Sequence, residues 1–424
     1  MNSPVDGPAH SLLDSPASPE VALLSALSPE DGDSPYASLA LLREAAPVYH
    51  CQREGLDTRF LTRFADCQAV LTNPDFVVPD RVWLLRKRPD WLGHPAADFF
   101  YSCLLGTNAA AHERLRRPLF RAFSARRIAA LSASVAEQVD AVLDRFADAG
   151  SDGGVADFQE LVAYPLSVAV VGGLIGVPAA EQGRFHQLGR DAARLLEPVR
   201  TAADWKLADQ AVLALREYFT GLLRERRARP AADLASTLLA QAGPAAAELT
   251  DRELVDLLLL VFVAGFETTV GLLGGSVFAL LTHPEQLALL RADRALLPGA
   301  VEESLRWDGP ALMTERLAAR PLEVGGVAIE PGGSVTVVLG AANRDPARYP
   351  DPDAFLVRRP DVRVLSFGAG AHYCLGAALA RLEGVVLLER LFARFPALGL
   401  AGPPVRRGSA ALRSFDRLPL TTTG

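Results

Sequence analysis

The most informative stretch of this chain is Phe367-Gly368-Ala369-Gly370-Ala371-His372-Tyr373-Cys374-Leu375-Gly376. Its glycines permit tight turns and allow the backbone to approach a flat ligand closely. Cys374 stands directly before a helical pattern that begins near Leu375. The free N–H groups of a helix N-terminus favour a thiolate over a thiol, so Cys374 is a candidate metal ligand. A buried cysteine in a glycine-rich turn, or a cysteine nucleophile, is the alternative.

The other cysteines show no sign of a metal cluster or a disulfide scaffold. Cys51, Cys67 and Cys103 lack a C-x-x-C spacing, and four cysteines are few for 424 residues. Such residues are usually part of the core, and a reducing cytoplasm suits them best. The formal net charge of −7 gives no reason to expect nucleic acid as a partner.

The chain begins with a polar segment that we expect to be a flexible tail. Residues 1–34 are rich in Ser, Pro and Asp, and the first Lys or Arg is Arg43. A secretory signal peptide would carry positive charge near its start, so no export signal is expected. Residues 35–424 contain no clear linker, and we expect them to form one domain.

One internal segment, Leu257 to Leu281, is apolar enough to suggest a membrane span, since Glu267 is its only charge. We favour a buried helix of a soluble protein. Thr250 and Glu253 form a capping-box pattern at its start, and Pro284 follows its end. We therefore expect no association with a membrane.

Hydrophobic periodicity predicts a mainly α-helical fold with small β-sheets. Apolar residues recur at helical spacing, and strand-like alternation occurs in two places, where glycine and proline mark turns. The clearest helical patterns cover 128–146, 207–226, 254–281 and 375–395, and the strand-like patterns cover 48–64 and 322–339. The pattern therefore indicates one large helical domain with small sheets attached.

The segment at 367–376 resembles the haem-binding signature of the cytochrome P450 family, F-G-x-G-x-H-x-C-x-G, at every fixed position. The resemblance extends from Ser34 to about Leu420, and is closest to the soluble actinobacterial biosynthetic branch. It implies a single catalytic domain of the P450 fold that encloses haem b (iron protoporphyrin IX). It also implies that Cys374 ligates the iron through a thiolate that favours O–O cleavage. Phe367 and Gly368 would lie against the haem.

A second motif lies in the long apolar helix. Ala264-Gly265-Phe266-Glu267-Thr268-Thr269 resembles the family's oxygen-activation motif, about 105 residues before the cysteine loop. The resemblance implies that Ala264 and Gly265 let the helix pass close to the haem, and that Glu267 and Thr268 deliver protons to dioxygen. A threonine that bonds back to a helix carbonyl is the alternative.

Glu303-Ser304-Leu305-Arg306 resembles the family's E-x-x-R motif. The i,i+3 spacing places Glu303 and Arg306 on one helix face, where they can pair. In the family a later arginine, here aligned with Arg359, completes a buried structural network on the haem side. A solvated surface pair is the alternative for the motif alone.

Four further residues are implied to hold the haem propionates. His112 and Arg116 match the family's H-x-x-x-R and lie one helical turn apart, while Arg316 and His372 match other propionate contacts. The chain departs from the bacterial branch just before His112, where Thr107–Ala111 replaces an Asp-Pro-Pro run. It also has Phe266 where histidine is frequent.

The resemblance implies a monooxygenase that inserts one oxygen atom from O2 into a hydrophobic small molecule, and in this branch a natural product is expected. No flavin or iron–sulfur motif is present, so electrons would come from a separate ferredoxin and an NAD(P)H-dependent ferredoxin reductase. A basic cluster could receive the acidic ferredoxin, or could equally be a solvated helix face. The cluster comprises Arg114, Arg117, Arg121, Arg126 and Arg127. We expect a cytoplasmic monomer.

The substrate pocket is expected to be apolar. Its predicted lining comprises Trp83, Leu84, Leu260, Ala264, Leu312, Met313 and Phe415. Aromatic residues of a helical protein are more often core residues, which is the alternative here. Two other functions share this sequence pattern: epoxidation, desaturation or oxidative coupling by the same haem, and a gas sensor that does not turn over. A haem-free auxiliary binding protein is a third alternative, but it would be expected to lose the cysteine or the acid–alcohol pair, and both are present.

Overall fold

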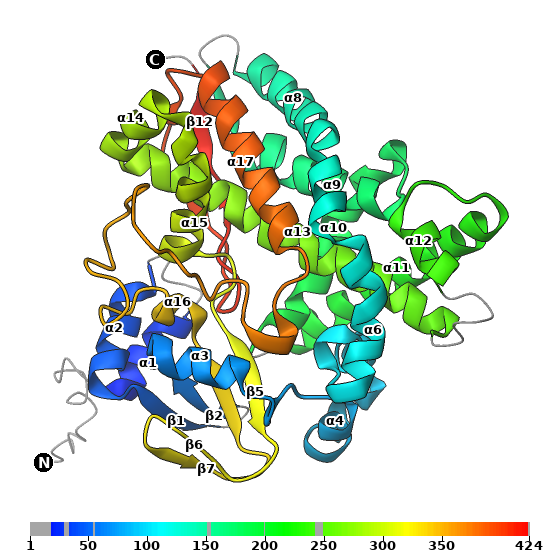
Figure 1. The fold of residues 1–424 in the computed structure, drawn as a ribbon, viewed down its shortest axis with the longest axis vertical. Coiled ribbons are helices and arrows are strands. Elements are labelled where there is room, and N and C mark those ends of the chain that lie inside the picture. Colours follow the sequence, from blue (N-terminus) through cyan, green and yellow to red (C-terminus); the bar gives the residue numbers. More distant parts are fainter. Residues whose placement is uncertain are drawn as a thin grey trace, which may run out of the picture.

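The computed structural model describes residues 18–28, 34–53, 56–150, 154–198, 200–241 and 249–422. Helices form most of the molecule, and the small sheets gather at one side of the helical body (Figure 1). The predicted class, mainly α with small β-sheets, is confirmed.

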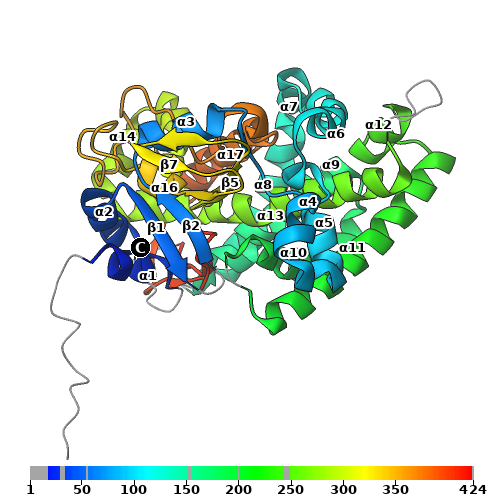
Figure 2. The same ribbon diagram turned by 90° about the horizontal axis from the view of Figure 1, so that it is seen from below.

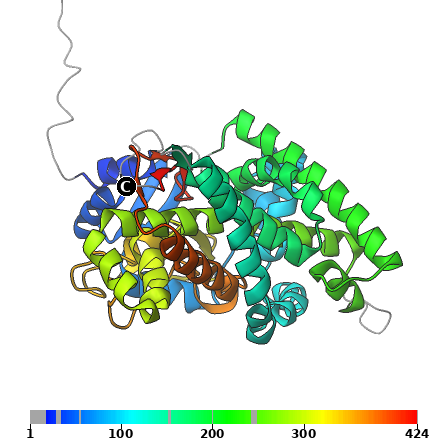
Figure 3. The same cartoon turned by 90° about the horizontal axis from the view of Figure 1, so that it is seen from above.

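The centre of the helical body is α13 (Asp251–Thr282). Its capping box forms as predicted, because Thr250 Oγ1 accepts from the Glu253 amide and Glu253 Oε2 accepts from the Thr250 amide. This helix is long and apolar enough to cross a membrane by composition, but 78% of its most apolar window is buried inside the protein. It is therefore a core helix, as Figures 2 and 3 show by the elements that surround it.

The helices around α13 supply the walls of the core. Those in contact with it include α9 (Tyr164–Ile175), α10 (Phe185–Ala192), α11 (Ala202–Ala228), α12 (Leu234–Gln241), α14 (Pro284–Ala292), α15 (Leu297–Asp308) and α17 (Ala377–Arg394). Further out lie α6 (Ala109–Ala122), α7 (Ala125–Ala130) and α8 (Ser132–Ala149). Shorter segments are α4 (Arg81–Lys87), η1 (Pro89–Gly93), α5 (Pro95–Phe100), η2 (Leu104–Gly106), η4 (Ala179–Arg184), η5 (Ala193–Leu196) and η6 (Arg294–Leu296), with the π-helix η3 (Gln159–Ala163) before α9.

The main sheet has the strand order β1-β2-β8-β5-β3. Its strands are β1 (Val48–Arg53), β2 (Leu56–Leu61), β3 (Phe76–Val77), β5 (Thr314–Ala318) and β8 (Ser334–Val337), and only the β2–β8 pair is parallel. The strand-like pattern at 48–64 is thus a hairpin, and α3 (Phe64–Thr72) begins at its end. The pattern at 322–339 divides into β6 (Leu322–Val324), β7 (Val327–Ile329) and β8, followed by the short helix α16 (Leu339–Ala342).

The C-terminal segment forms two small sheets that lie against the helical body. One has the order β4-β12-β9 and the other pairs β10 with β11. The strands are β4 (Val155–Asp157), β9 (Gly399–Leu400), β10 (Val405–Arg406), β11 (Phe415–Arg417) and β12 (Pro419–Thr421).

The expected tail over residues 1–34 contains a packed helix. Helix α1 (Pro19–Leu27) buries Ala22, Leu23 and Ala26 in a small core that it shares with α2 (Tyr36–Ala45). The prediction of a loose tail is therefore wrong for residues 19–27, because three apolar side chains on one face find a partner helix. Residues 1–17 and 29–33 lie outside the described part of the chain.

Candidate active site

The cysteine loop is a tight turn that ends at α17. Gly368 and Gly370 have φ angles of +69° and +68°, and a Cβ at Gly370 would collide with the Leu71 carbonyl oxygen. The Cys374 amide donates to the Phe367 carbonyl at 2.9 Å, and α17 begins at Ala377 after the 3-10 turn η7 (Gly370–His372). Two glycines are thus required for the geometry that presents this cysteine.

Cys374 is the one exposed cysteine of the four, and it opens onto an internal cavity. The surrounding protein raises the pKa of the thiol, because removal from bulk water outweighs the opposing influences. Those influences are the backbone N–H groups of Gly376 and Ala377 and the charges of Arg116 and Arg381. The helix N-terminus therefore favours the thiolate but is not sufficient to produce it.

The cavity has a volume of about 860 Å³ and lies between the cysteine loop and α13. Phe367, Gly368 and Cys374 line it from the loop, while Ala264, Gly265 and Thr268 line it from α13. Ala264 is exposed to this space, so the small residues let the helix backbone border it directly. Two segments that are about a hundred residues apart in sequence thus share one chamber.

Within α13 the acid and the alcohol point to different sides. Thr268 lines the cavity, and its hydroxyl donates to the Ala264 carbonyl at 2.7 Å. Glu267 is buried at 2% exposure and lies outside the cavity lining, where Oε2 accepts from Arg407 Nη1 at 2.5 Å. Its Oε1 has no hydrogen-bond partner in the described part of the chain. The threonine therefore contacts the cavity directly, whereas the acid stands behind it.

Four hydrogen-bond donors converge at the edge of the cavity. The rings of His112 and His372 lie 4.1 Å apart, Arg116 donates to the Tyr373 carbonyl at 2.5 Å, and Arg316 donates to the Glu315 carbonyl at 2.7 Å. His112 Nε2 is buried without a partner among the described residues. Helix α6 supplies His112 and Arg116, and it starts at Ala109, whose φ is +48°.

These four donors share an environment without a compensating carboxylate. Burial and the neighbouring positive groups lower the pKa of His372 to about 3 and also lower that of His112. Burial lowers the pKa of Arg316 to about 10. In the part of the chain that the structure describes, no carboxylate forms an ion pair with any of the four. The cluster is therefore suited to an anionic ligand group.

Comparison with known proteins identifies this arrangement. The family model described as cytochrome P450 matches residues 86–399. The chain belongs to the cytochrome P450 family. It is accordingly a haem-dependent oxidoreductase of the monooxygenase class.

Relatives of this P450 include enzymes of actinobacterial biosynthesis. The chain is 38% identical to 6-deoxyerythronolide B hydroxylase of Saccharopolyspora erythraea, over 92% of this chain and 96% of that protein. It is 36% identical to the cytochrome P450 monooxygenase PikC of Streptomyces venezuelae, over 95% of each chain. Among solved structures, P450BioI in complex with an acyl-ligated acyl carrier protein has a TM-score of 0.86 at 31% identity, covering 93% of this chain and 99% of that one. The predicted P450 fold is confirmed.

The residues present fit a haem group. A macrocycle between the cysteine loop and α13 would place its two propionates where His112, Arg116, Arg316 and His372 meet. His112 Nε2 has no partner among the described residues, and Arg316 is buried without an ion pair there, so a propionate oxygen would give the first an acceptor and the second a counter-charge.

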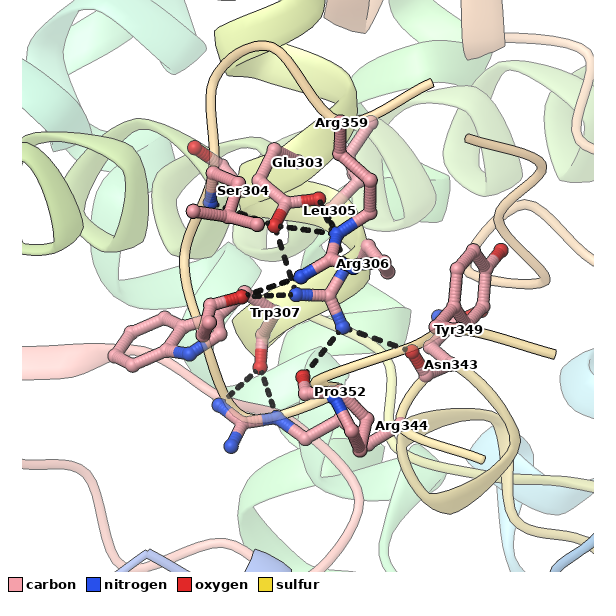
Figure 4. A network of polar contacts seen from close by, with 12 residues as sticks. Glu303, Ser304, Leu305, Arg306, Trp307, Asn343, Arg344, Tyr349, Pro352 and Arg359 are labelled. Carbon is pink, nitrogen blue, oxygen red and sulfur yellow. Dashed lines mark hydrogen bonds and ion pairs between the residues drawn. The ribbon is translucent and has the colours of Figure 1, made fainter. Parts of the chain in front are cut away.

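Beside the cysteine loop lies the network of Glu303, Arg306 and Arg359 (Figure 4). Glu303 accepts from Arg306 at 2.7 and 2.8 Å and from Arg359 Nε at 3.1 and 3.2 Å, and Glu303 and Arg306 are both 0% exposed. Arg306 also donates to the carbonyls of Asn343 and Pro352. The pair is therefore buried, and the surface alternative is excluded.

This network is connected to the start of the cysteine loop. Asn343 Nδ2 donates to Ser366 Oγ at 2.8 Å, and the Leu365 amide donates to Asn343 Oδ1 at 2.8 Å. Ser366 Oγ in turn donates to the Leu305 carbonyl at 2.6 Å. The hydrogen bonds thus tie α15 and the loop after α16 to the segment that carries Cys374.

The predicted substrate lining is partly correct. Trp83, Leu260, Ala264 and Met313 line the cavity. The prediction is wrong for three residues, which belong to the hydrophobic cores instead: Leu84, Leu312 and Phe415. Leu84 lies on the buried side of α4, Leu312 packs beside Gly340 on the α2 side of the main sheet, and the Phe415 ring packs against Phe278.

Several functional residues escaped the sequence interpretation. Ala411 and Leu412 line the cavity in place of Phe415, and Arg407 pairs with Glu267 across 140 residues of sequence. Tyr101, Arg200 and Glu315 also line the cavity. None of these belongs to a local motif, so only the fold could bring them to the site.

The basic cluster on α6 and α7 is only partly available to a partner. Arg114 pairs with Glu253, and Arg117 lies 3.8 Å from Glu113. Arg121, Arg126 and Arg127 are exposed. Helix α7 contacts α17, which begins after Cys374, so the exposed arginines border the side of the molecule that holds the cysteine loop.

Proposed function

We propose that this P450 binds haem b through Cys374 and inserts one oxygen atom of O2 into a hydrophobic small molecule. The observation that carries the proposal is the shared cavity, which has Cys374 on one wall and Thr268 on the other. At its edge, the unpartnered His112 Nε2 and three neighbouring cationic or imidazole groups favour a ligand with carboxylates.

Cys374 would ligate the iron, and His112, Arg116, Arg316 and His372 would hold the propionates. Phe367 and Gly368 would border one face of the ring, with Ala264 and Gly265 at the other. When bound, haem supplies the reductive activation of O2 and the oxidising power for attack on the substrate. The protein's share is to hold the ligand atom, keep the chamber apolar and deliver protons.

Proton delivery would use Thr268 and Glu267. The Thr268 hydroxyl is at the cavity wall, and rotation away from the Ala264 carbonyl would release it to donate into the chamber. Glu267 Oε1 has no partner in the described structure and is free to carry a proton, while Oε2 is held by Arg407. A water molecule between the acid and the alcohol would complete the path.

The substrate would be a natural product with a large apolar surface. Trp83, Phe99, Leu260, Met313 and Leu412 supply apolar contacts in the cavity. The relatives named for 6-deoxyerythronolide B hydroxylation and for PikC are consistent with this class. A structural relative at 30% identity is named for C–S bond formation, so oxidative coupling by the same haem is the second candidate.

Electrons would come from a ferredoxin and an NAD(P)H-dependent ferredoxin reductase, with docking at the exposed arginines of α6 and α7. A cytoplasmic, monomeric enzyme is consistent with this scheme. A haem-free binding protein is disfavoured, because Cys374 and the acid–alcohol pair are retained.

The decisive experiment is the absorption spectrum of the reduced, carbon-monoxide-bound protein. We expect a thiolate-ligated haem spectrum that Cys374→Ser loses. Turnover with NAD(P)H, a surrogate ferredoxin and its reductase, followed by product analysis, then separates oxygen insertion from coupling or desaturation. Haem that is retained without NAD(P)H-dependent product from a library of macrocyclic and polyketide substrates would indicate a sensor. Absence of haem binding would refute the proposal.

A further inference from the structure

The cavity contains a charged group that the proposed chemistry does not use. Arg200 lies between η5 and α11 and lines the cavity together with Tyr101. Its guanidinium carbon is 5.2 Å from the ring centroids of both Trp91 and Trp205. Arg200 therefore forms part of an aromatic cage in the chamber wall.

The charge of Arg200 has no carboxylate partner in the described structure. Its Nε donates to the Leu195 carbonyl at 3.1 Å, its Nη2 donates to the same carbonyl, and the Tyr101 hydroxyl lies close to the guanidinium. The acids that line the nearby wall are committed elsewhere: Glu197 accepts from Ser409 and the Ala410 amide, and Glu315 accepts from Ser334 at 2.6 Å. Burial lowers the pKa of Arg200 and outweighs the opposing influence of Tyr101, Glu315 and Glu197, and neither acid forms an ion pair with Arg200 among the described residues.

The lining of the whole cavity also has more basic than acidic residues. Seven lysine or arginine residues line the cavity against four acidic residues. Two of the basic residues, Arg116 and Arg316, belong to the propionate cluster. Lys87 lines the cavity from α4 without an ion pair in the described chain, and Arg88 stacks on Trp91 at 3.6 Å.

We infer that Arg200 binds the carboxylate of an amphiphilic substrate whose apolar body lies toward α13. A guanidinium has five N–H donors, so the terminal N–H groups that Leu195 does not occupy can hold a carboxylate, and the surrounding aromatic rings exclude water from the pair. Leu260 and Ala264 provide apolar contact for the rest of the molecule. The inference rests on the proposed function, because it names the substrate class of the same chamber.

The test is a binding comparison with probes of equal chain length. Decanoate, methyl decanoate and decyltrimethylammonium are titrated into the haem-loaded protein at neutral pH, by calorimetry and by the haem absorption shift. We expect decanoate to bind about tenfold to a hundredfold more tightly than its ester, the range of a charge-assisted hydrogen bond. Arg200→Gln is expected to remove this difference by weakening decanoate alone, and Arg200→Lys to retain part of it.

Arg86→Gln is the matched control, because Arg86 is exposed on α4 and does not line the cavity. It is expected to change none of the affinities. Equal affinity for acid and ester would overturn the inference, and so would an equal loss of both in Arg200→Gln, which would indicate a structural role. If the ammonium probe bound most tightly, Glu315 rather than Arg200 would determine which charged headgroup the cavity prefers. Calorimetric selectivity for decanoate in a protein without NAD(P)H-dependent turnover would refute the proposed function and leave this inference standing.

Discussion

Thr268 and Glu267 are adjacent in sequence but reach different surroundings. Successive residues of an α-helix are rotated by roughly 100°, so one side chain enters the cavity while its neighbour points behind the wall. Arg407 holds the acid there at 2.5 Å. The motif therefore places its two polar side chains on different sides of the cavity wall, as the proposed proton path requires.

Replacement of Thr268 by alanine is expected to uncouple the enzyme. The variant removes the hydroxyl at the cavity wall, so electrons would be diverted from product to peroxide. We expect product formed per NAD(P)H to fall about a hundredfold, the lower end of the range for loss of a proton donor. Thr268→Ser keeps the hydroxyl and is expected to remain near the wild-type ratio. An unchanged ratio in the alanine variant would exclude this role.

At the residue scale, the resemblance to the family predicted which residues meet at the cavity but not the side chains that complete it. His112, Arg116, Arg316 and His372 were all predicted and do converge. The sequence does not show that Trp83 lines the cavity and its neighbour Leu84 does not. Helix α4 is only seven residues long, and tertiary packing decides which side of it faces the cavity.

Among the elements, the C-terminal segment is held to α15 by a buried carboxylate. Asp308 Oδ1 accepts from Tyr36 at 2.9 Å and from Arg413 at 3.1 Å, and Oδ2 lies 2.9 Å from Arg406. The same segment carries Arg407 and the cavity residue Leu412. Asp308 thus positions parts of both the proton path and the substrate chamber.

Asp308→Asn is expected to destabilise the fold in a pH-dependent way. The amide leaves two buried arginines without their counter-charge, at a cost of about 3 kcal/mol at neutral pH. The arginines hold the pKa of Asp308 well below its ordinary value of 3.8, so its stabilisation is complete above that value and is lost as pH falls through the lower, folded-state pKa.

Denaturant unfolding at about pH 7 and about pH 3 tests whether the stabilisation by Asp308 decreases as the pH falls. The difference in the free energy of unfolding between the wild type and Asp308→Asn is expected to be smaller at about pH 3 than at about pH 7. Asp361→Asn is the control, since Arg363 and Arg348 also lower the pKa of Asp361, but that carboxylate is fully exposed. A difference that grows in acid would contradict the assignment.

The E-x-x-R pair links a helix to the loop that supports Cys374. Glu303→Gln is expected to cost about 3–5 kcal/mol of unfolding free energy, because it leaves Arg306 buried without a counter-charge. Glu181 and Arg184 have the same i,i+3 spacing but are exposed, so Glu181→Gln is expected to cost less than about 1 kcal/mol. Similar losses in the two variants, measured by denaturant unfolding, would show that burial does not set the cost.

Element boundaries were predictable where local chemistry determines them. The capping box of Thr250 and Glu253 starts α13 at the expected position. By contrast, α1 is only nine residues long and its apolar residues do not all lie on one face, since Val21 and Leu24 are exposed, so its stability depends on α2. A composition-based interpretation could not detect a helix whose stabilising contacts come from another element.

At the scale of the whole molecule, charge is distributed unevenly. The chain has a formal net charge of −7, yet Arg121, Arg126 and Arg127 are exposed together near the cysteine-loop side. Phe120 lies among them and is 65% exposed. A basic surface with one apolar side chain complements an acidic ferredoxin, since opposite potentials steer the encounter and the ring can be buried on contact.

Arg121→Glu is therefore expected to raise the ferredoxin concentration needed for half-maximal turnover about threefold to tenfold at low salt, with a smaller effect at high salt. Lys206→Glu makes the same change in net charge on α11, whose neighbours are α5 and η5 rather than α17, and is expected to leave that concentration unchanged. Equal effects of the two variants would show that net charge alone controls the encounter. An effect of Arg121→Glu on peroxide-driven turnover, which needs no ferredoxin, would instead place the defect within the enzyme.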